Sequence, residues 1–393
     1  MLPDPRADDL NGSRTLNDAR GGSSAFSRRF VLMLAMVLVL IIAGCQTAEP
    51  SVTPAKTPPP RATPPPSIVG VNAVTLIDPS TRTRQYDLIK AEGFRAVRVY
   101  IEGDLIERSP GQFDWADTDS LVMGAADRGL MILGLVSYAP SWAVPPQNRL
   151  LIHPAPADAK PWRNFIAQAA QRYSNVIHNW EIWNEPNIDD SFAPAPDLAL
   201  YSSMLKEAYS AIKSVDPRSV VITGGTSPAV DTATEMSPVT FIKGLYDHGA
   251  GEFFDAVAMH PYSSPDLLSA PGPVDSSNSN RAIKEVSELM ASQGQSDKRI
   301  WFTEFGASTS TPGATAPDLS GQQVGVTQQR QAEILTDGIN YMRSLPNGGP
   351  IFLFDFRDVE TGSRDVEYNY GLLRSDFSAK PALAAVQALL GAR

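Results

Sequence analysis

The feature that most constrains this chain is a repeated alternation, after residue 67, of short β-branched runs with longer amphipathic stretches. Eight strand-like runs recur, at residues 68–74, 96–101, 130–136, 176–183, 220–223, 256–260, 300–304 and 351–356. Strand followed by helix, repeated, gives a parallel sheet, and eight repeats match a (β/α)₈ TIM barrel. A doubly wound sheet fits less well, because residues 72–79 lack the glycine-rich first turn of that fold.

The intervening stretches have the period of helices. In the clearest one, apolar residues recur at spacings of four and three, at Tyr201, Leu205, Ala208, Ile212 and Val215. One apolar stripe of this kind predicts a helix packed on a core. Asp216-Pro217 is expected to end this helix, and Gly93 an earlier one that begins near Pro79.

The N-terminal region has the pattern of an export signal. An uncharged run over residues 30–45 follows Arg28 and Arg29 and ends in Ile42-Ala43-Gly44-Cys45, which resembles a bacterial lipobox. We expect residues 1–45 to be a signal peptide and Cys45 to be lipid-modified. A retained membrane anchor is the alternative, although a spanning helix needs about 20 residues.

Residues 46–66 form a Pro/Thr-rich linker, with eight prolines between residues 50 and 66. Such a composition favours extended polyproline geometry and serves as a semi-rigid spacer. Residues 67–393 then form the (β/α)₈ domain. The expected location is the outer side of the bacterial cytoplasmic membrane, or the periplasm or cell envelope.

Charge and cysteine content exclude several classes of function. The formal net charge of −10 argues against nucleic acid as a partner. A single cysteine excludes an intrachain disulfide and a multi-cysteine metal site. His153, His178 and His248 have no metal-ligand spacing with one another, so no metal and no cofactor are expected. No protein partner is implied.

Chemically active side chains fall at the expected C-terminal ends of the strands, where barrels of this kind build their sites. They are Arg98, Tyr138, Trp142, Asn184, Glu185, His260, Tyr262, Glu304 and Asp355. Glu185 and Glu304 belong to strands four and seven, so both can face one opening. A pair of carboxyl groups supplies the proton donor and the negative partner that cleavage of a glycosidic bond requires.

Two motifs carry a family resemblance. The runs W-E-I-W-N-E-P-N at 180–187 and W-F-T-E-F-G at 301–306 resemble the acid/base and nucleophile signatures of clan A retaining glycoside hydrolases. Residues 109–114 and 138–143 make the chain most similar to glycoside hydrolase family 39, with families 5, 10 and 42 close. The resemblance implies a retaining glycosidase acting on a β-linked cell-envelope or extracellular polysaccharide or oligosaccharide.

The resemblance also implies roles for individual residues. Glu185 would be the general acid/base and Glu304 the nucleophile, facing each other across about 5 to 5.5 Å. Asn184 would bind the sugar 2-hydroxyl, and Arg98 would steady the nucleophile. The structural alternatives are that Glu185 caps the next helix and that Glu304 is a rim residue paired with Arg98.

Four further residues are predicted to contact substrate. His260 and Tyr262 match the strand-six His-x-Tyr, and their spacing of two puts both on one face of a strand. Tyr138 and Trp142 follow strand three, and the Trp142 indole suits the apolar face of a sugar. Packing in the core is the alternative for Trp142.

The run at 352–357 departs from the family pattern, which has a tryptophan on strand eight beneath the reacting sugar. Here the residues are F-L-F-D-F-R. Asp355 would bind a sugar hydroxyl or pair with Arg357.

Two other functions remain open at this stage. A transglycosylase would use the same intermediate with a sugar as acceptor. A catalytically inactive polysaccharide-binding scaffold would keep the cleft, although binding alone does not require two such carboxylates.

Overall fold

The computed structural model describes residues 68–73, 78–271, 278–310 and 325–390. The predicted signal peptide, Cys45 and the linker lie outside these residues, so their assignments stay predictions. Within the described ranges, no helix combines the length and the apolar character that crossing a bilayer would require.

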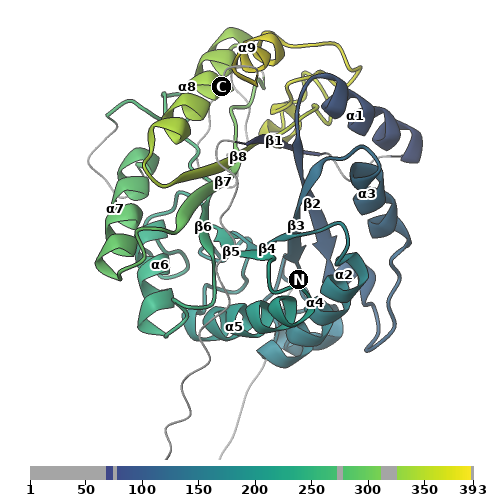
Figure 1. Ribbon diagram of the computed structural model, residues 1–393, viewed down its shortest axis with the longest axis vertical. Helices are drawn as coiled ribbons and strands as arrows, with labels where there is room; N and C mark the ends of the chain where they lie inside the picture. Colours follow the sequence, from purple (N-terminus) through teal and green to yellow (C-terminus); the bar gives the residue numbers. More distant parts are fainter. Residues whose placement is uncertain (1–67, 74–77, 272–277, 311–324, 391–393) are drawn as a thin grey trace, which may run out of the picture. The chain divides into compact units, whose positions relative to one another are not determined.

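The strands form a closed parallel barrel in which each strand pairs with the next and the last pairs with the first (Figure 1). They are β1 Val69–Asn72, β2 Ala96–Glu102, β3 Met131–Ser137, β4 Asn179–Asn184, β5 Val220–Gly225, β6 Ala256–Met259, β7 Arg299–Phe305 and β8 Gly348–Leu353. The prediction of an eight-stranded (β/α)₈ TIM barrel is confirmed.

The strand bounds differ from those expected by a few residues, and three of the differences matter for the site or have a clear cause. β4 begins at Asn179 because the amides of Val176 and Ile177 bond back to Tyr173 and close the preceding helix. β6 and β8 end one and two residues before His260 and Asp355, which therefore lie in the loops that follow these strands.

Helices surround the barrel (Figure 1). They are α1 Pro79–Ala91, α2 Gly103–Ile106, α3 Ala116–Ala126, α4 Ala159–Tyr173, α5 Leu198–Val215, α6 Pro238–Asp247, α7 Ser279–Ser292, α8 Gln328–Ser344 and α9 Pro381–Leu390. Short 3₁₀ turns are η1 Ser141–Ala143, η2 Pro146–Asn148 and η3 Val366–Asn369. As predicted, α5 buries Tyr201, Leu205, Ala208 and Ile212, and Gly93, at φ 92°, follows the end of α1.

The barrel interior has an apolar layer and, nearer the C-terminal strand ends, a polar layer. In the apolar layer Trp301 stacks on Phe352 with ring centroids 6.4 Å apart. Side chains two residues apart share a face of a strand. Arg98 and Thr303 therefore follow buried Ala96 and Trp301 on the inner face, and they form the polar layer with Glu181 and Asn72.

Candidate active site

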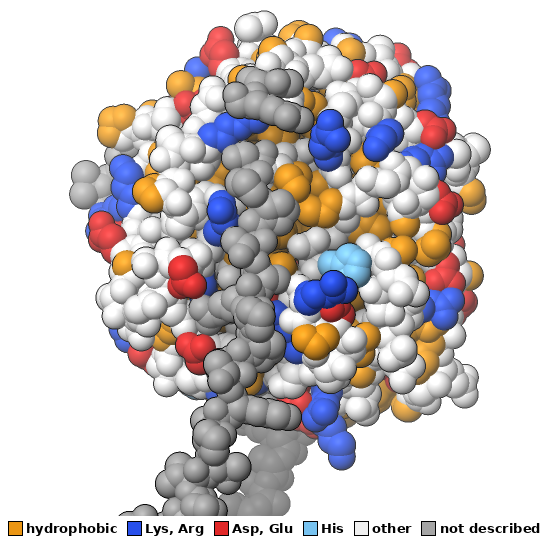
Figure 2. All heavy atoms as spheres, viewed as in Figure 1, with side chains coloured by type: hydrophobic (Ala, Val, Ile, Leu, Met, Phe, Trp, Pro, Cys, Tyr) orange, Lys and Arg blue, Asp and Glu red, His pale blue; other side chains and the backbone are white. Residues whose placement is uncertain are grey.

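A cavity of about 240 Å³ opens beside the polar layer. Loops and strand ends from most of the barrel line it, through Tyr100, Glu102, Tyr138, His153, Asn184, Glu185, Ser191, Tyr262, Glu304, Phe354, Glu367 and Tyr370. Figure 2 shows hydrophobic side chains gathered near the centre of one face of the molecule, with charged side chains spread around them. The cavity brings together five of the residues that the sequence singled out, namely Tyr138, Asn184, Glu185, Tyr262 and Glu304.

Glu304, near the end of β7, is held by several donors. The Arg98 guanidinium donates to Oε1 at 2.5 Å, the Tyr262 hydroxyl donates to Oε2 at 2.8 Å, and the Tyr100 hydroxyl lies 3.4 Å from Oε1. Burial alone would raise the pKa of Glu304, but the positive charges of His260 and Arg98 and these hydrogen bonds outweigh it and lower that pKa. Glu304 is therefore kept as a carboxylate.

Arg98 is completely buried and anchored at every nitrogen. Its Nε donates to Glu181 Oε2 at 2.6 Å, Nη1 also donates to Asn72 Oδ1 at 3.1 Å, and Nη2 donates to Asn184 Oδ1 at 2.9 Å. A guanidinium only donates hydrogen bonds. The Asn184 amide must therefore turn its oxygen to Arg98, which leaves its NH₂ group as the end available to a ligand.

Glu185 follows the end of β4 in a left-handed backbone conformation, with φ 43°. Its amide donates to Gly225 O at 3.0 Å, which ties this turn to β5. In a regular strand, consecutive residues such as Asn184 and Glu185 would point to opposite faces. Here both side chains line the cavity, because Glu185 leaves the strand conformation for a left-handed one. That conformation is unfavourable for a residue with a Cβ atom.

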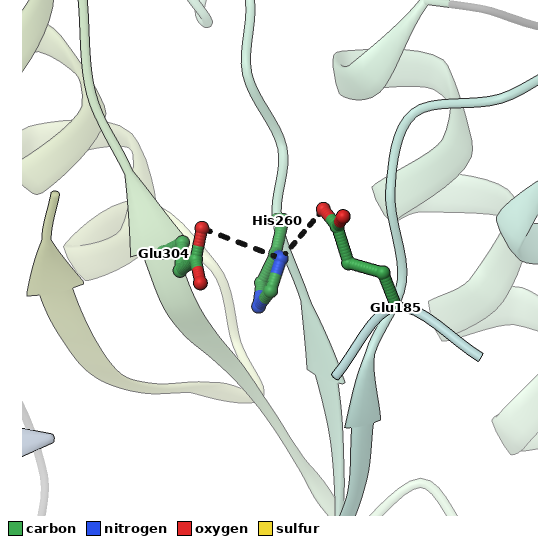
Figure 3. A group of neighbouring side chains, drawn as sticks. All are labelled: Glu185, His260 and Glu304. Carbon is green, nitrogen blue, oxygen red and sulfur yellow. Dashed lines mark hydrogen bonds and ion pairs between the residues drawn. The ribbon is translucent and has the colours of Figure 1, made fainter. Parts of the chain in front are cut away.

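The His260 ring lies between the two glutamates (Figure 3). Its Nδ1 is 2.9 Å from Glu185 Oε1 and 3.7 Å from Glu304 Oε2, and its Nε2 is 3.0 Å from Thr303 Oγ1. Burial lowers the pKa of His260, but the negative charge of Glu304 and the contacts with Glu181 and Glu185 outweigh burial and raise it to about 9. This shift favours the imidazolium form of the ring at neutral pH.

The two carboxyl groups are close together. One oxygen of Glu185 and one of Glu304 lie within 4.8 Å of each other. Inverting glycosidases separate their carboxyl groups by about 6.5 to 9.5 Å to seat a water molecule, whereas retaining ones keep them about 5 to 5.5 Å apart. An oxygen–oxygen approach within 4.8 Å is nearer to the shorter spacing than to the longer one.

The same atoms meet the distance requirement for metal ligands, because donor atoms of Glu185, His260 and Glu304 lie within 4.8 Å of one another. Both oxygens of Glu304 already accept hydrogen bonds, from Arg98 and Tyr262. A cation bound there would also lie beside a buried guanidinium, which is electrostatically unfavourable. We assign no metal to these residues, and the expectation of a metal-free site stays a prediction.

Two of the predicted substrate contacts are not among the residues that line this cavity. Trp142 belongs to η1, where its indole N–H donates to Glu107 O at 2.9 Å, and it does not line the cavity. Asp355 accepts from the amide of Phe356 at 2.5 Å and is also absent from the lining. Arg357, its suggested partner, donates to Ser375 O at 2.7 Å, and the two side chains act on each other through their charges.

Aromatic residues form the cavity wall where the family pattern has a strand-eight tryptophan. Phe354 and Tyr370 pack edge to face with ring centroids 5.3 Å apart, and Tyr262 lies against both. Elsewhere in the lining, Tyr138 stacks on His153 with ring centroids 3.7 Å apart. The wall therefore offers apolar ring surface to a ligand.

The sequence analysis gave no role to several residues of the site. Glu181 and Thr303 lie inside the quoted motifs but were not singled out, although a carboxylate among buried tryptophans requires a buried partner. Tyr100 could have been found, because it is two residues after Arg98 and shares its face of β2. Phe354 and Tyr370 carry no sequence signal of this kind, since loop geometry alone brings them to the cavity.

A family model matches most of this chain. Residues 63–343 match the family model described as cellulase, glycosyl hydrolase family 5. This is one of the families that the motifs placed close to family 39.

Solved structures share the fold. A family 39 glycoside hydrolase from Bacteroides cellulosilyticus WH2 is 24% identical with a TM-score of 0.63, over 82% of this chain and 63% of that one. A monomeric beta-xylosidase from Caulobacter crescentus CB15 is 18% identical with a TM-score of 0.61, over 84% and 70%. A GH5_18 protein from Streptomyces cattleya, in complex with GlcNAc, is 17% identical with a TM-score of 0.59, over 83% and 80%.

Proposed function

The chain belongs to glycosyl hydrolase family 5, the cellulase family, and is a glycoside hydrolase; on this premise we propose that it cleaves β-linked sugars with retention, through Glu185 and Glu304. The observation that supports this most is the approach of the two carboxyl groups within 4.8 Å, combined with their unequal surroundings.

In the first half-reaction, an oxygen of Glu304 attacks the anomeric carbon while the bond from that carbon to the leaving oxygen breaks. The leaving oxygen keeps the electron pair and takes the proton of Glu185. Glu304 is thereby converted from a carboxylate into a glycosyl ester. The lowered pKa of Glu304 favours this role, because the attacking group has to be ionised beforehand.

In the second half-reaction, water attacks the same carbon and the ester bond to Glu304 breaks, which restores its carboxylate. Glu185, now an anion, accepts a proton from the water and returns to its starting state. Two displacements at one carbon leave the anomeric configuration unchanged. A sugar in place of water would give transglycosylation by the same steps.

The remaining side chains of the cavity suit a sugar ring. The NH₂ end of Asn184 would donate to the 2-hydroxyl, since Arg98 holds the other end of that amide. Phe354 and Tyr370 would offer ring faces to the apolar C–H groups of the sugar. They would thus replace the tryptophan that strand eight lacks.

We further propose that the substrate is a polysaccharide or oligosaccharide of the cell envelope or its surroundings. This part rests on the export pattern of residues 1–45 and on lipid attachment at Cys45, which would tether the barrel through the proline-rich linker. The names of structurally similar proteins, among them a beta-xylosidase and a xylanase, and the description of the family as cellulase suggest β-linked pentose and hexose polymers as the first substrates to test.

The test combines labelling with product stereochemistry. A panel of 2-deoxy-2-fluoro glycosides with activated leaving groups should inactivate the enzyme covalently, and peptide mass analysis should place the label on Glu304. Proton NMR of the first product should show the β anomer from a β-linked substrate. An α anomer, or a label on another residue, would disprove the proposal.

A further inference from the structure

We propose that Glu181, Thr303 and His260 form a buried hydrogen-bonded relay that places the catalytic proton of Glu185 on its Oε2 atom. In this view Glu181 and Thr303 are positioning residues that act through His260. The inference rests on the proposed acid role of Glu185 and adds to it the group that orients the acid.

The relay begins at Glu181, a carboxylate in the barrel interior with no exposed surface. Its Oε2 pairs with Arg98 at 2.6 Å, and its Oε1 accepts from the Gly225 amide at 3.0 Å and from the Thr303 hydroxyl at 2.8 Å. Burial raises the pKa of Glu181, but the Arg98 charge and nearby His260 outweigh it and lower that pKa to about 2. Because a carboxylate only accepts hydrogen bonds, Thr303 must donate its one hydroxyl proton to Glu181.

This assignment decides the protonation of the histidine. Thr303 Oγ1 has only lone pairs left for His260 Nε2, 3.0 Å away, so Nε2 must carry a hydrogen. The ring faces three carboxyl groups, with Glu181 Oε1 3.8 Å from Nε2, and Glu185 Oε1 and Glu304 Oε2 at 2.9 and 3.7 Å from Nδ1. The nearest other cation, Arg98, is paired with Glu181 and Glu304. Because Glu181 and Glu304 are carboxylates beside the ring, Nδ1 carries a hydrogen as well and donates it to Glu185.

The donation to Glu185 orients the acid. Since Oε1 accepts from His260, the proton of the neutral carboxyl group must sit on Oε2, the oxygen that remains for the leaving group. After transfer, Glu304 is a neutral ester and Glu185 is the anion. The negative charge passes from Glu304 to Glu185, so the net charge of the site does not change. His260 lies close enough to both carboxyl groups to stabilise this charge before and after the transfer.

The backbone of β5 makes room for this arrangement. A Cβ atom on Gly225 would lie 2.1 Å from His260 Nε2 and 2.6 Å from Thr303 Oγ1, closer than any real Cβ contact. Any other residue there would therefore displace the His260–Thr303 pair. Glycine is therefore needed at position 225 of β5, where His260 and Thr303 meet against the strand backbone.

Nitrogen-15 NMR tests the charge of His260 without any turnover. The chain has four histidines, and removing each of the other three in turn assigns their signals. We expect His260 to show two protonated ring nitrogens at pH 7. A neutral ring at that pH would overturn the inference whether or not the protein is a retaining glycosidase.

Kinetics on aryl glycosides test the positioning role. Thr303→Val removes only the hydroxyl, and it should lower kcat/KM at least about 10-fold for poor leaving groups, which depend on the acid proton, and no more than about 3-fold for dinitrophenolate. It should also shift the alkaline limb of the pH profile. Thr303→Ser restores a hydroxyl and should rescue both properties.

Glu181→Gln provides a second variant, with circular dichroism and melting temperature as folding checks; if its loss of the Arg98 ion pair prevents folding, Thr303→Val decides the matter. An equal loss across all leaving groups, or an unmoved alkaline limb, would reduce Thr303 to a structural role and overturn the inference. Inactivity of the wild type on every glycoside would instead count against the proposed function, while the NMR result would still stand.

Discussion

The ends of β7 and β4 face the same cavity but surround their carboxyl groups in opposite ways. Glu304 receives hydrogen bonds from Arg98 and Tyr262, with the Tyr100 hydroxyl nearby. For Glu185, His260 is the one side-chain partner found among the described residues. Saturation with donors suits a group that must stay ionised, whereas an oxygen left without a donor suits a group that must give up and regain a proton.

The largest loss of activity is expected on substitution of Glu304, the carboxylate with more hydrogen-bond donors. Glu304→Gln removes the proposed nucleophile and should lower kcat by roughly 10⁴-fold or more, on the scale of losses seen for covalent nucleophiles. Steady-state kinetics, with circular dichroism as the folding check, would measure it. Near wild-type turnover by a correctly folded variant would remove Glu304 from the mechanism.

At Glu185, which has fewer hydrogen-bond donors, the loss of activity on substitution should depend on the leaving group of the substrate. Glu185→Gln should slow cleavage of poor leaving groups by about 10² to 10⁴-fold, because general acid catalysis contributes that much. With dinitrophenolate the first step should be nearly normal, so that the glycosyl-enzyme accumulates and a burst is seen. A loss that is equal for all leaving groups would contradict the assignment of the acid.

Removing one hydrogen-bond donor to Glu304 should make the surroundings of Glu304 and Glu185 more alike. Tyr262→Phe removes one hydrogen bond to the carboxylate, which should raise the pKa of Glu304 from its lowered value toward the ordinary one. Since Glu304 must be ionised to attack, the acid limb of kcat/KM should move to higher pH, with roughly a 10-fold loss of rate. An acid limb that stays in place would show that Tyr262 does not stabilise this charge.

The smallest effect is expected outside the cavity. Trp142→Phe removes the hydrogen bond to Glu107 O and should cost about 1 kcal/mol in the free energy of unfolding, with KM unchanged. Urea denaturation and KM for one aryl glycoside would measure both. Phe354→Ala is the matched control, because Phe354 lines the cavity and its loss should raise KM. A raised KM for Trp142→Phe would restore the sugar-platform role.

Much of the fold could be predicted because its signals are local. β-branched runs alternate with helical periodicity whatever the distant contacts, and Asp216 and Gly93 mark two helix ends where the structure has them. Glu185 and Glu304 could be paired because the C-terminal ends of all strands in such a barrel meet at one opening.

Other features depended on irregular backbone. Thr303 and Glu304 are consecutive, yet both serve the site, and a register shift between β7 and β8 falls over Phe302–Phe305. The roles of Trp142 and Asp355 are hard to predict from the sequence because both lie in loops, where no periodicity tells the direction of a side chain.

By itself the sequence determined the order of strands and helices, the closed barrel and the two glutamates at its opening, because each depends on neighbours in the chain or on a rule common to all such barrels. The family resemblance already implied that Arg98 steadies the nucleophile, but only the tertiary structure decided which atoms meet around each glutamate. Arg98, Tyr262 and His260 come from β2 and the loop after β6. Their contacts with Glu304 and Glu185 depend on ångström-scale approaches that hydrogen bonding and charge require and that spacing along the chain does not encode.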